Sequence, residues 1–219
     1  MSEIDMAHSA TPLRSDMPGQ TPEAPTPLHL ARLDTVAAVL ADHDVRRFAD
    51  LGCGRGALLD RLAGSTKVDH VVAVDLDGST LAALQSRLAE VPGLSLEIVE
   101  GSLLDGRLRL GPIDAAVLLE AIEHIPPEDL SKLEMAVFRA WRPRLVVMTT
   151  PNADANGYLG VPSGRRRHWD HRFEWGRERF ERWAQGVARR SGYRVGFQPI
   201  GWVHPSFGAP TQMAVFLNP

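Results

Sequence analysis

The chain has 219 residues, a formal net charge of −3 and 44% hydrophobic residues, which is the composition of an ordinary folded protein. That length favours a single domain of the usual ~100–200 residues, and no apolar run reaches the ~18 residues of a membrane helix. A single cysteine excludes a disulfide framework within the chain and a metal site built from several cysteines. The slightly acidic balance excludes a basic coat over the whole surface, although not a local basic patch. The first residues lack the apolar stretch of a secretion signal, so we expect a cytoplasmic protein with no membrane partner.

Residues 1–27 are rich in proline and polar residues and show no hydrophobic period. Such a segment buries too little apolar surface to offset its ordering entropy, so we expect a disordered tail there. The folded domain is then expected over residues 28–219. Apolar residues at helical spacing predict that this domain begins with a helix ending near Asp42.

Strands and helices are expected to alternate over the rest of the chain. The expected strands are 48–51, 70–77, 94–100, 113–120 and 144–150. The helices expected between them are 57–63, 79–90 and 128–141. A last helix at 176–190 precedes two strands, 193–198 and 211–217, which have no helix between them. This order predicts an α/β fold with a mostly parallel, doubly wound sheet and an antiparallel hairpin at one edge.

A glycine-rich turn, DLGCGRG at residues 50–56, joins the first strand to a helix. Glycine permits a tight turn and lets a ligand approach the backbone closely. About twenty residues further on, the second strand ends at Asp75, whose carboxylate suits the two hydroxyls of an adenosine ribose. The spacing matches neither the pyrophosphate-binding G-x-G-x-x-G motif nor a phosphate-binding loop with Gly-Lys-Ser/Thr. The alternative is a plain Rossmann-like loop, in which Cys53 is a small packing residue.

The turn resembles the first motif of class I S-adenosylmethionine-dependent methyltransferases, whose fold is Rossmann-like. The resemblance implies S-adenosylmethionine as the cofactor, with its methionine part at the glycine turn and its ribose at Asp75. It also implies that Ser102 flanks the adenine and that Leu119 lines the methionine end. The cofactor-binding residues implied in this way are Asp50, Gly52, Gly54, Asp75, Ser102 and Leu119.

Two glutamates and a histidine follow the fourth expected strand, in the sequence Glu120-Ala-Ile-Glu123-His124. Spaced i, i+3 and i+4, they would share one face of a single helical turn. Carboxylates and imidazoles are metal ligands, and ligands bind at the carboxyl ends of strands in open α/β sheets. A solvated charged helix face is the alternative. A fourth ligand would come from elsewhere, and the long loop before the last helix offers His168 and His171.

Four segments in order resemble a single family. They are EAIEH (120–124), TTPN (149–152), RHWDHRFEW (167–175) and PTQMAVF (210–216). Together they resemble the HEN-type small-RNA 3′-terminal ribose 2′-O-methyltransferases, and most closely the bacterial members, over residues 28–217. The resemblance implies an enzyme that transfers a methyl group from S-adenosylmethionine to the 2′-hydroxyl at the 3′ end of RNA.

The same resemblance implies one divalent metal, with Glu120, Glu123, His124 and one downstream histidine as catalytic ligands. We expect the fourth ligand to be His171, because Asp-His-x-Phe-Glu-Trp matches the family most tightly, and we expect His168 to support the site or contact RNA. Two carboxylates and two imidazoles favour Mn²⁺ or Co²⁺ over Mg²⁺ at equal concentration, although the cellular abundance of Mg²⁺ can compensate.

Basic and aromatic residues in the long loop are the candidates for gripping RNA. Arg165, Arg166 and Arg167 form a run with no acidic residue between them, which predicts phosphate contacts. Together with His168, Trp169 is expected to lie against the RNA, where its ring could stack an unpaired terminal base.

Other loop residues have two interpretations. Phe173 and Trp175 offer rings for base stacking, but anchoring of the loop to the core is the alternative for both and is favoured for Trp175. Asn152 could orient the ribose or the metal loop, and turn formation explains it equally well. Glu174 is expected to pair with Arg177 at i+3.

Two rival functions and one partner follow from these patterns. A metal-dependent O-methyltransferase of small vicinal diols, such as catechols, would share the chemistry, but it would have no use for the arginine run. A non-catalytic S-adenosylmethionine-binding scaffold in RNA processing is the second rival.

Bacterial relatives often carry this unit as the carboxyl half of a protein that assists an RNA-repair ligase, so a ligase is a candidate partner. Only the Pro-rich tail precedes the domain here, so we expect a role in repair to require that other half from a separate chain.

Overall fold

A computed structural model describes residues 25–63 and 67–219 of the chain. The expected disordered tail lies outside the described residues except for its last positions, where Pro27 already begins helix α1 (Pro27–Asp42). The side chain of Thr26 caps this helix by accepting a hydrogen bond from the His29 N–H, and Pro27 fits the first turn because its missing N–H is not needed there. Helix α1 therefore begins one residue before the predicted start of the domain at residue 28.

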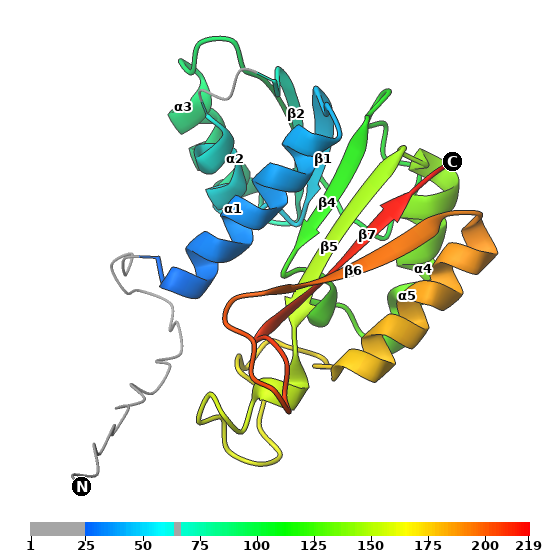
Figure 1. Ribbon diagram of the computed structural model, residues 1–219. Coiled ribbons are helices and arrows are strands. Elements are labelled where there is room, and N and C mark those ends of the chain that lie inside the picture. Colours follow the sequence, from blue (N-terminus) through cyan, green and yellow to red (C-terminus); the bar gives the residue numbers. More distant parts are fainter. Residues whose placement is uncertain (1–24, 64–66) are drawn as a thin grey trace, which may run out of the picture.

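One seven-stranded sheet forms the middle layer of the molecule (Figure 1), in the order β3-β2-β1-β4-β5-β7-β6. Its strands are β1 (Arg47–Leu51), β2 (His70–Asp75), β3 (Ser95–Glu100), β4 (Ala115–Leu119), β5 (Leu145–Pro151), β6 (Arg194–Ile200) and β7 (Thr211–Leu217). The first five run parallel, whereas β7 is antiparallel to both β5 and β6. This arrangement confirms the predicted doubly wound sheet with an antiparallel hairpin at its edge.

Helices cover both faces of the sheet (Figure 1). On one face lie α1, α2 (Ala57–Leu62) and α3 (Gly78–Leu88). On the other lie α4 (Leu130–Met135) and α5 (Arg177–Ser191). Strand residues alternate between the two apolar cores, so that Phe48 packs on the first face and Ala49 on the second.

The single helix expected at 128–141 is divided into three pieces. A 3₁₀ turn, η2 (Pro127–Asp129), leads into α4, which continues as a π-helical segment, η3 (Ala136–Trp141). Each piece spans only about one or two turns, so the spacing of apolar residues in the sequence does not distinguish these helix types.

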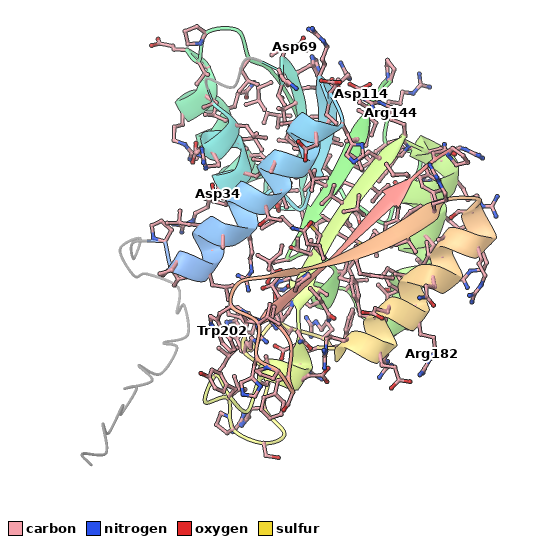
Figure 2. The ribbon with its side chains drawn as sticks, viewed as in Figure 1. Asp34, Asp69, Asp114, Arg144, Arg182 and Trp202 are labelled. Atoms are coloured by element: carbon pink, nitrogen blue, oxygen red, sulfur yellow. The ribbon has the colours of Figure 1, made fainter. Side chains whose placement is uncertain are left out.

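The carboxyl ends of β1, β2, β4 and β5 meet at one end of the sheet, where the long loops gather (Figure 1). The opposite end carries surface ion pairs, such as Arg144 with Asp114 and Arg46 with Asp69 (Figure 2). In the described part of the chain, no helix has the length and apolar character needed to cross a membrane. Ligands bind at the carboxyl ends of the strands in open α/β sheets, so the loop-rich end is the expected position of a binding site.

Candidate functional site

The chain changes direction sharply where β4 ends. Glu120 adopts a left-handed backbone conformation with φ of 51°, which is uncommon for a residue with a side chain. A 3₁₀ turn, η1 (Ile122–His124), follows it. The prediction that Glu120, Glu123 and His124 share one helical turn is therefore wrong, because the helical backbone begins only after Glu120. The turn nevertheless directs Glu123 into the protein.

Glu123 is a fully buried carboxylate at the centre of this end of the sheet. Its Oε2 accepts a 3.0 Å hydrogen bond from the hydroxyl of Thr150 on β5, while its buried Oε1 has no hydrogen-bond partner among the described residues. Burial, and next the charge of Glu120, raise the pKa of Glu123 well above its usual value. A buried carboxylate with an unpartnered oxygen is suited to bind a cation.

Glu120 lies near Glu123 but has a partner of its own. Its Oε2 is 2.8 Å from Nη2 of Arg32 on α1, and the Nε of Arg32 donates to the Thr211 hydroxyl. The Oε1 of Glu120 is also buried without a hydrogen-bond partner. Each glutamate thus keeps one carboxylate oxygen that nothing in the described chain satisfies.

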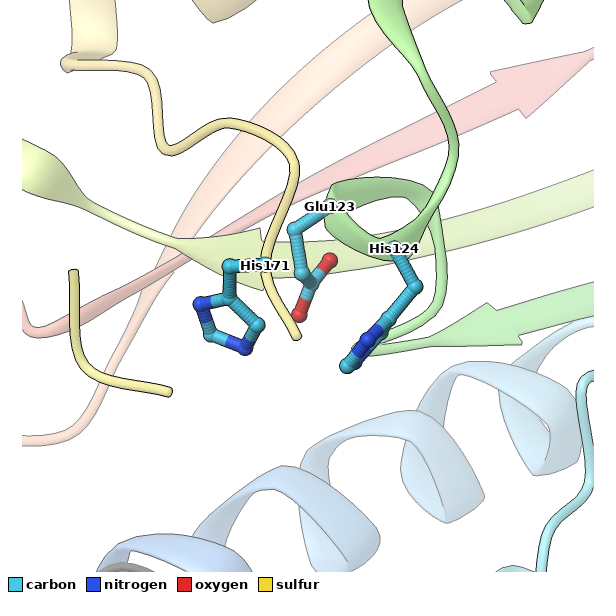
Figure 3. Close-up of side chains that lie close together, drawn as sticks. All are labelled: Glu123, His124 and His171. Atoms are coloured by element: carbon cyan, nitrogen blue, oxygen red, sulfur yellow. The ribbon is translucent and has the colours of Figure 1, made fainter. Parts of the chain in front are cut away.

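Two histidines flank the Glu123 carboxylate (Figure 3). His124 comes from the 3₁₀ turn and His171 from the long loop, and one ligand atom from each lies within 4.8 Å of the others and of Glu123. Their ring centroids are 4.9 Å apart. Burial, followed by the nearby His171, lowers the pKa of His124, which favours the neutral ring that a metal requires.

Each of these histidines is held by a carboxylate. The Nδ1 of His124 is 3.0 Å from Oδ2 of Asp170, and the Nδ1 of His171 is 2.5 Å from Oε1 of Glu174. A carboxylate at Nδ1 fixes the ring orientation and leaves Nε2 as the free nitrogen. This arrangement is typical of histidines that bind metals.

His168 lies at the margin of the cluster. Its ring centroid is 5.6 Å from that of His171 and 6.2 Å from that of His124. Its Nδ1 accepts a hydrogen bond from the backbone N–H of Asp170, which shapes the loop. These contacts favour His171 over His168 as the fourth ligand.

The expected ion pair between Glu174 and Arg177 is absent, and that prediction is wrong. Glu174 holds His171 instead, while its other oxygen accepts from the side chain of Asn156. Arg177 pairs with Asp154, because α5 begins at this arginine and directs it toward the loop after β5.

Arg167 also has a different role from the one expected. Its guanidinium donates to the carbonyl oxygens of Asn152 and Pro210 and to the side chain of Asn156. Burial lowers its pKa to about 10. Three of its donors are thus used inside the protein, which disfavours the predicted contact of Arg167 with phosphate. Arg165 and Arg166 are exposed and stay candidates.

The aromatic residues of the loop divide into two kinds. Trp169 is 72% exposed, so its ring is accessible to a ligand. Phe173 and Trp175 are buried against each other in the core, which confirms the anchoring interpretation. Asn152 is buried, and its amide donates to the carbonyl oxygens of Phe207 and Ala209, so it fixes the β6–β7 connection.

The glycine turn after β1 is packed against the end of β2. Gly52, Gly54 and Gly56 all have positive φ, and no atom lies within 4 Å of the place where a Cβ on Gly54 would stand. The Gly54 N–H donates to Asp75 Oδ2 at 2.8 Å, so Asp75 ties the turn to β2. Burial, and next the charge of Asp75, raise the pKa of Asp50 to about 7.

The remaining cofactor candidates lie at the carboxyl ends of β4 and β3. Leu119 is the last residue of β4 and is partly buried, one position before Glu120. Ser102 follows β3, where its hydroxyl accepts from the Leu104 N–H. A Cβ on Gly52 would stand 3.3 Å from Cβ of Ala121, so the glycine turn directly adjoins the segment that carries the glutamates.

Comparisons with known proteins agree with this geometry. A model described as a methyltransferase domain matches residues 48–144. The chain is 36% identical to the methyltransferase domain of bacterial CtHen1, with a TM-score of 0.78, and the match covers 87% of this chain and 99% of that domain. The chain belongs to the Hen1 methyltransferase family. Its fold is therefore the Rossmann-like fold of class I methyltransferases, as the glycine turn predicted.

Two further matches are proteins longer than this chain. The small RNA 2′-O-methyltransferase of Mus musculus is 33% identical over 184 residues, which are 80% of this chain and 46% of that protein. The chain thus spans about half the length of this curated relative. A chain of the Pnkp1/Rnl/Hen1 RNA repair complex shares the fold, with a TM-score of 0.67, 24% identity and coverage of 88% of this chain and 42% of that chain.

Three side chains of the site were missed by reasoning from the sequence. Asp170 orients His124, Thr150 donates to Glu123, and Arg32 pairs with Glu120. Asp170 and Thr150 lay within the quoted Hen1 motifs, so the motifs contained the signal. Arg32 lies on α1, far from those motifs in the sequence, and only the packing of α1 against the sheet brings it to the site.

Proposed function

We propose that the chain transfers a methyl group from S-adenosylmethionine to the 2′-hydroxyl of the 3′-terminal ribose of RNA, with a divalent metal held by two glutamates and two histidines, Glu120, Glu123, His124 and His171. The observation that carries this proposal is the cluster of Glu123, His124 and His171 beside the glycine turn. Its relatives that are named small RNA 2′-O-methyltransferases or Hen1 support the same reaction.

The donor set fits a divalent metal. Glu120 and Glu123 each keep a buried oxygen without a hydrogen-bond partner, and His124 and His171 each keep Nε2 free because a carboxylate holds Nδ1. These four residues would hold the ion. A divalent ion supplies Lewis acidity, which lowers the pKa of an attached oxygen toward neutrality and so makes a ribose hydroxyl a usable nucleophile. Mixed oxygen and nitrogen ligands favour Mn²⁺ or Co²⁺ over Mg²⁺ at equal concentration.

The other residues of the chain prepare the two substrates. Asp75 and the turn containing Gly52 and Gly54 form the place for S-adenosylmethionine, between β1 and β2. The exposed ring of Trp169 lies next to His168, with ring centroids 5.5 Å apart, and offers a stacking surface for the terminal base. Arg165 and Arg166 supply exposed positive charge for the phosphate backbone.

Metal chelation gives a reason for a preference for RNA ends. Only at a 3′ terminus are the 2′- and 3′-hydroxyls both free, so that they form a vicinal diol. An internal nucleotide has its 3′-oxygen in a phosphodiester, and a terminal 3′-phosphate adds charge and bulk. The same chemistry would suit a small vicinal diol such as a catechol, but such a substrate needs no arginines.

An RNA-repair ligase is proposed as a partner on the basis of the Hen1 resemblance. The structural likeness to a chain of the Pnkp1/Rnl/Hen1 complex concerns the fold. Co-purification of the chain with a ligase from the same cell would support this part of the proposal, and methyl transfer does not depend on it.

The proposed reaction is tested with labelled S-adenosylmethionine and a short RNA in the presence of Mn²⁺. The controls are the same RNA ending in a 2′-deoxyribose, the same RNA with a 3′-phosphate, and a reaction with EDTA. We expect label only on the free 3′ end and only with metal. Label on none of the RNAs would overturn the RNA substrate, and label that survives EDTA would remove the metal from the proposal.

A further inference from the structure

A group of aromatic side chains, most of them exposed, lies at the same end of the sheet as the site without a role in it. Tyr158 comes from the loop after β5, and Trp202, His204 and Phe207 come from the β6–β7 connection. The ring centroid of Tyr158 is 4.6 Å from that of Trp202 and 5.1 Å from that of His204, which stacks on Phe207 at 4.7 Å. We call these four residues the aromatic platform.

The platform leaves much apolar surface in water. Tyr158 is 54% exposed, Trp202 is 44% exposed and Phe207 is 41% exposed. Contacts among the rings hold the two loops together, but they account for only part of each ring. Large aromatic side chains gathered at the surface are typical of a binding surface.

The loop after β5 makes hydrogen bonds both to the platform and to the proposed metal site. Asn152 donates to the carbonyl oxygen of Phe207, and Asn156, two residues before Tyr158, donates to the Glu174 carboxylate that holds His171. Trp202 accordingly lies among the long loops, at the end of the sheet opposite Asp114 and Arg144 (Figure 2). A polymer whose end occupies the site has this surface as a neighbour.

The two segments that carry the platform have a charge that suits a polyanion. Residues 155–169 and 199–210 contain no aspartate or glutamate, although the whole chain is acidic. The first of these segments carries the exposed Arg165 and Arg166, and the second carries His204. Aromatic rings next to positive charge form the usual surface for single-stranded nucleic acid, in which bases stack and phosphates meet cations.

We propose that the aromatic platform stacks the bases that precede the 3′-terminal nucleotide of single-stranded RNA. This inference rests on the proposed function, because it assumes that the terminal ribose occupies the site of Glu123, His124 and His171. It adds a second contact region to the one expected at Trp169. Stacking is tolerant of base identity, so the platform would bind unpaired bases upstream of the terminal nucleotide whatever their sequence.

The test compares methyl transfer to a single-stranded RNA with transfer to the same RNA lacking the bases at the nucleotides just before the terminal one. For the unsubstituted protein, we expect the abasic RNA to raise KM at least about fivefold, which is the lower end of one lost base stack. Trp202→Ala is expected to raise KM for the intact RNA by a similar factor with kcat unchanged. It is expected to abolish the difference between the two RNAs, while Trp202→Phe restores it.

The control variant is Met135→Ala, which removes an apolar side chain that is 61% exposed on α4 and remote from the platform. Thermal unfolding midpoints close to that of the unsubstituted protein would exclude loss of folding as the cause of a raised KM. Equal KM values for the two RNAs with the unsubstituted protein would overturn the platform and leave the proposed function standing. No transfer to either RNA by the unsubstituted protein would overturn both.

Discussion

The carboxylate of Asp170 lies 3.0 Å from Nδ1 of His124, and it comes from the loop residue directly before His171. One short loop segment therefore supplies a proposed ligand and also the group that orients a second one. Asp170 also forms an ion pair with Arg172, whose Nη2 lies 3.6 Å from Oδ1 of Asp170. The geometry of the cluster thus depends on the path of this loop as much as on the strand ends.

We expect Asp170→Asn to weaken Mn²⁺ binding by about 10–100-fold, the usual effect of removing a carboxylate that orients a metal-binding histidine. The loss would follow from a weaker hold on the His124 ring. Isothermal titration with Mn²⁺ measures the change. The matched control is Asp129→Asn, which removes a carboxylate paired with Lys132 at the surface. Equal affinities for both variants would contradict a role of Asp170 in metal binding.

We expect Glu123→Gln to abolish methyl transfer while leaving S-adenosylmethionine binding near normal. The substitution keeps the size of the buried side chain and its contact with Thr150, but it removes the negative charge that a cation requires. Fluorescence or calorimetric titration with S-adenosylmethionine checks the second half of the prediction. Loss of both methyl transfer and S-adenosylmethionine binding would show instead that Glu123 is needed for the structure.

The sequence predicted this part of the molecule unevenly. The apolar runs of the strands predicted the mostly parallel sheet, because burial on both faces leaves runs that few other structures produce. Glu123 and His124 are neighbours in the sequence, so their proximity followed from the chain itself. His171 came only from the family resemblance, since no local pattern says which distant loop closes over a strand end.

Where the predictions failed, tertiary contacts decided the outcome. The run of three arginines gave no sign that Arg167 turns inward, because its acceptors are backbone carbonyls that only the folded loops bring together. Glu120 was placed on a helix by its spacing, yet its left-handed backbone and its pairing with Arg32 depend on how α1 packs on the sheet. Local spacing carries no information about either contact.

Metal affinity is expected to rise with pH above the usual titration range of a glutamate carboxyl. The pKa of Glu123 is raised by burial and by Glu120, so the metal-free protein holds a proton there that the metal must displace. The pKa of His124 is lowered, which weakens the competition between a proton and the metal at this ring. Mn²⁺ titrations at three pH values measure the slope. An affinity that does not change with pH would contradict the buried proton.

Asp50→Asn is expected to stabilise the ligand-free protein at pH 8 and to have little effect near pH 4. The pKa of Asp50 is raised to about 7, so between pH 4 and 7 the folded protein keeps a proton that the unfolded chain releases, and stability falls as pH rises. Above pH 7 the buried charge costs on the order of 2–4 kcal/mol. Thermal midpoints across this range test the sign, with the exposed Asp42→Asn as control. A gain that is the same at both pH values would argue against a buried ionisation.

Substitutions of Arg167 and Arg165 are expected to affect different properties, the first the stability of the fold and the second the binding of RNA. Arg167→Ala removes a buried cation and leaves the carbonyl oxygens of Asn152 and Pro210 without their donor, so we expect a loss of about 3 kcal/mol in the free energy of unfolding. Arg165→Ala is expected to leave stability unchanged, because its side chain is exposed.

Affinity for RNA, measured at several salt concentrations, is expected to fall more for Arg165→Ala than for Arg167→Ala. Arg165→Ala is expected to weaken binding of single-stranded RNA and to reduce the slope of log affinity against log salt by about 0.7, the value for one lost phosphate contact. Denaturant unfolding and fluorescence anisotropy on the same samples provide both measurements. If Arg165→Ala lowers the unfolding free energy as much as Arg167→Ala, or leaves the salt slope unchanged, then Arg165 does not contact phosphate.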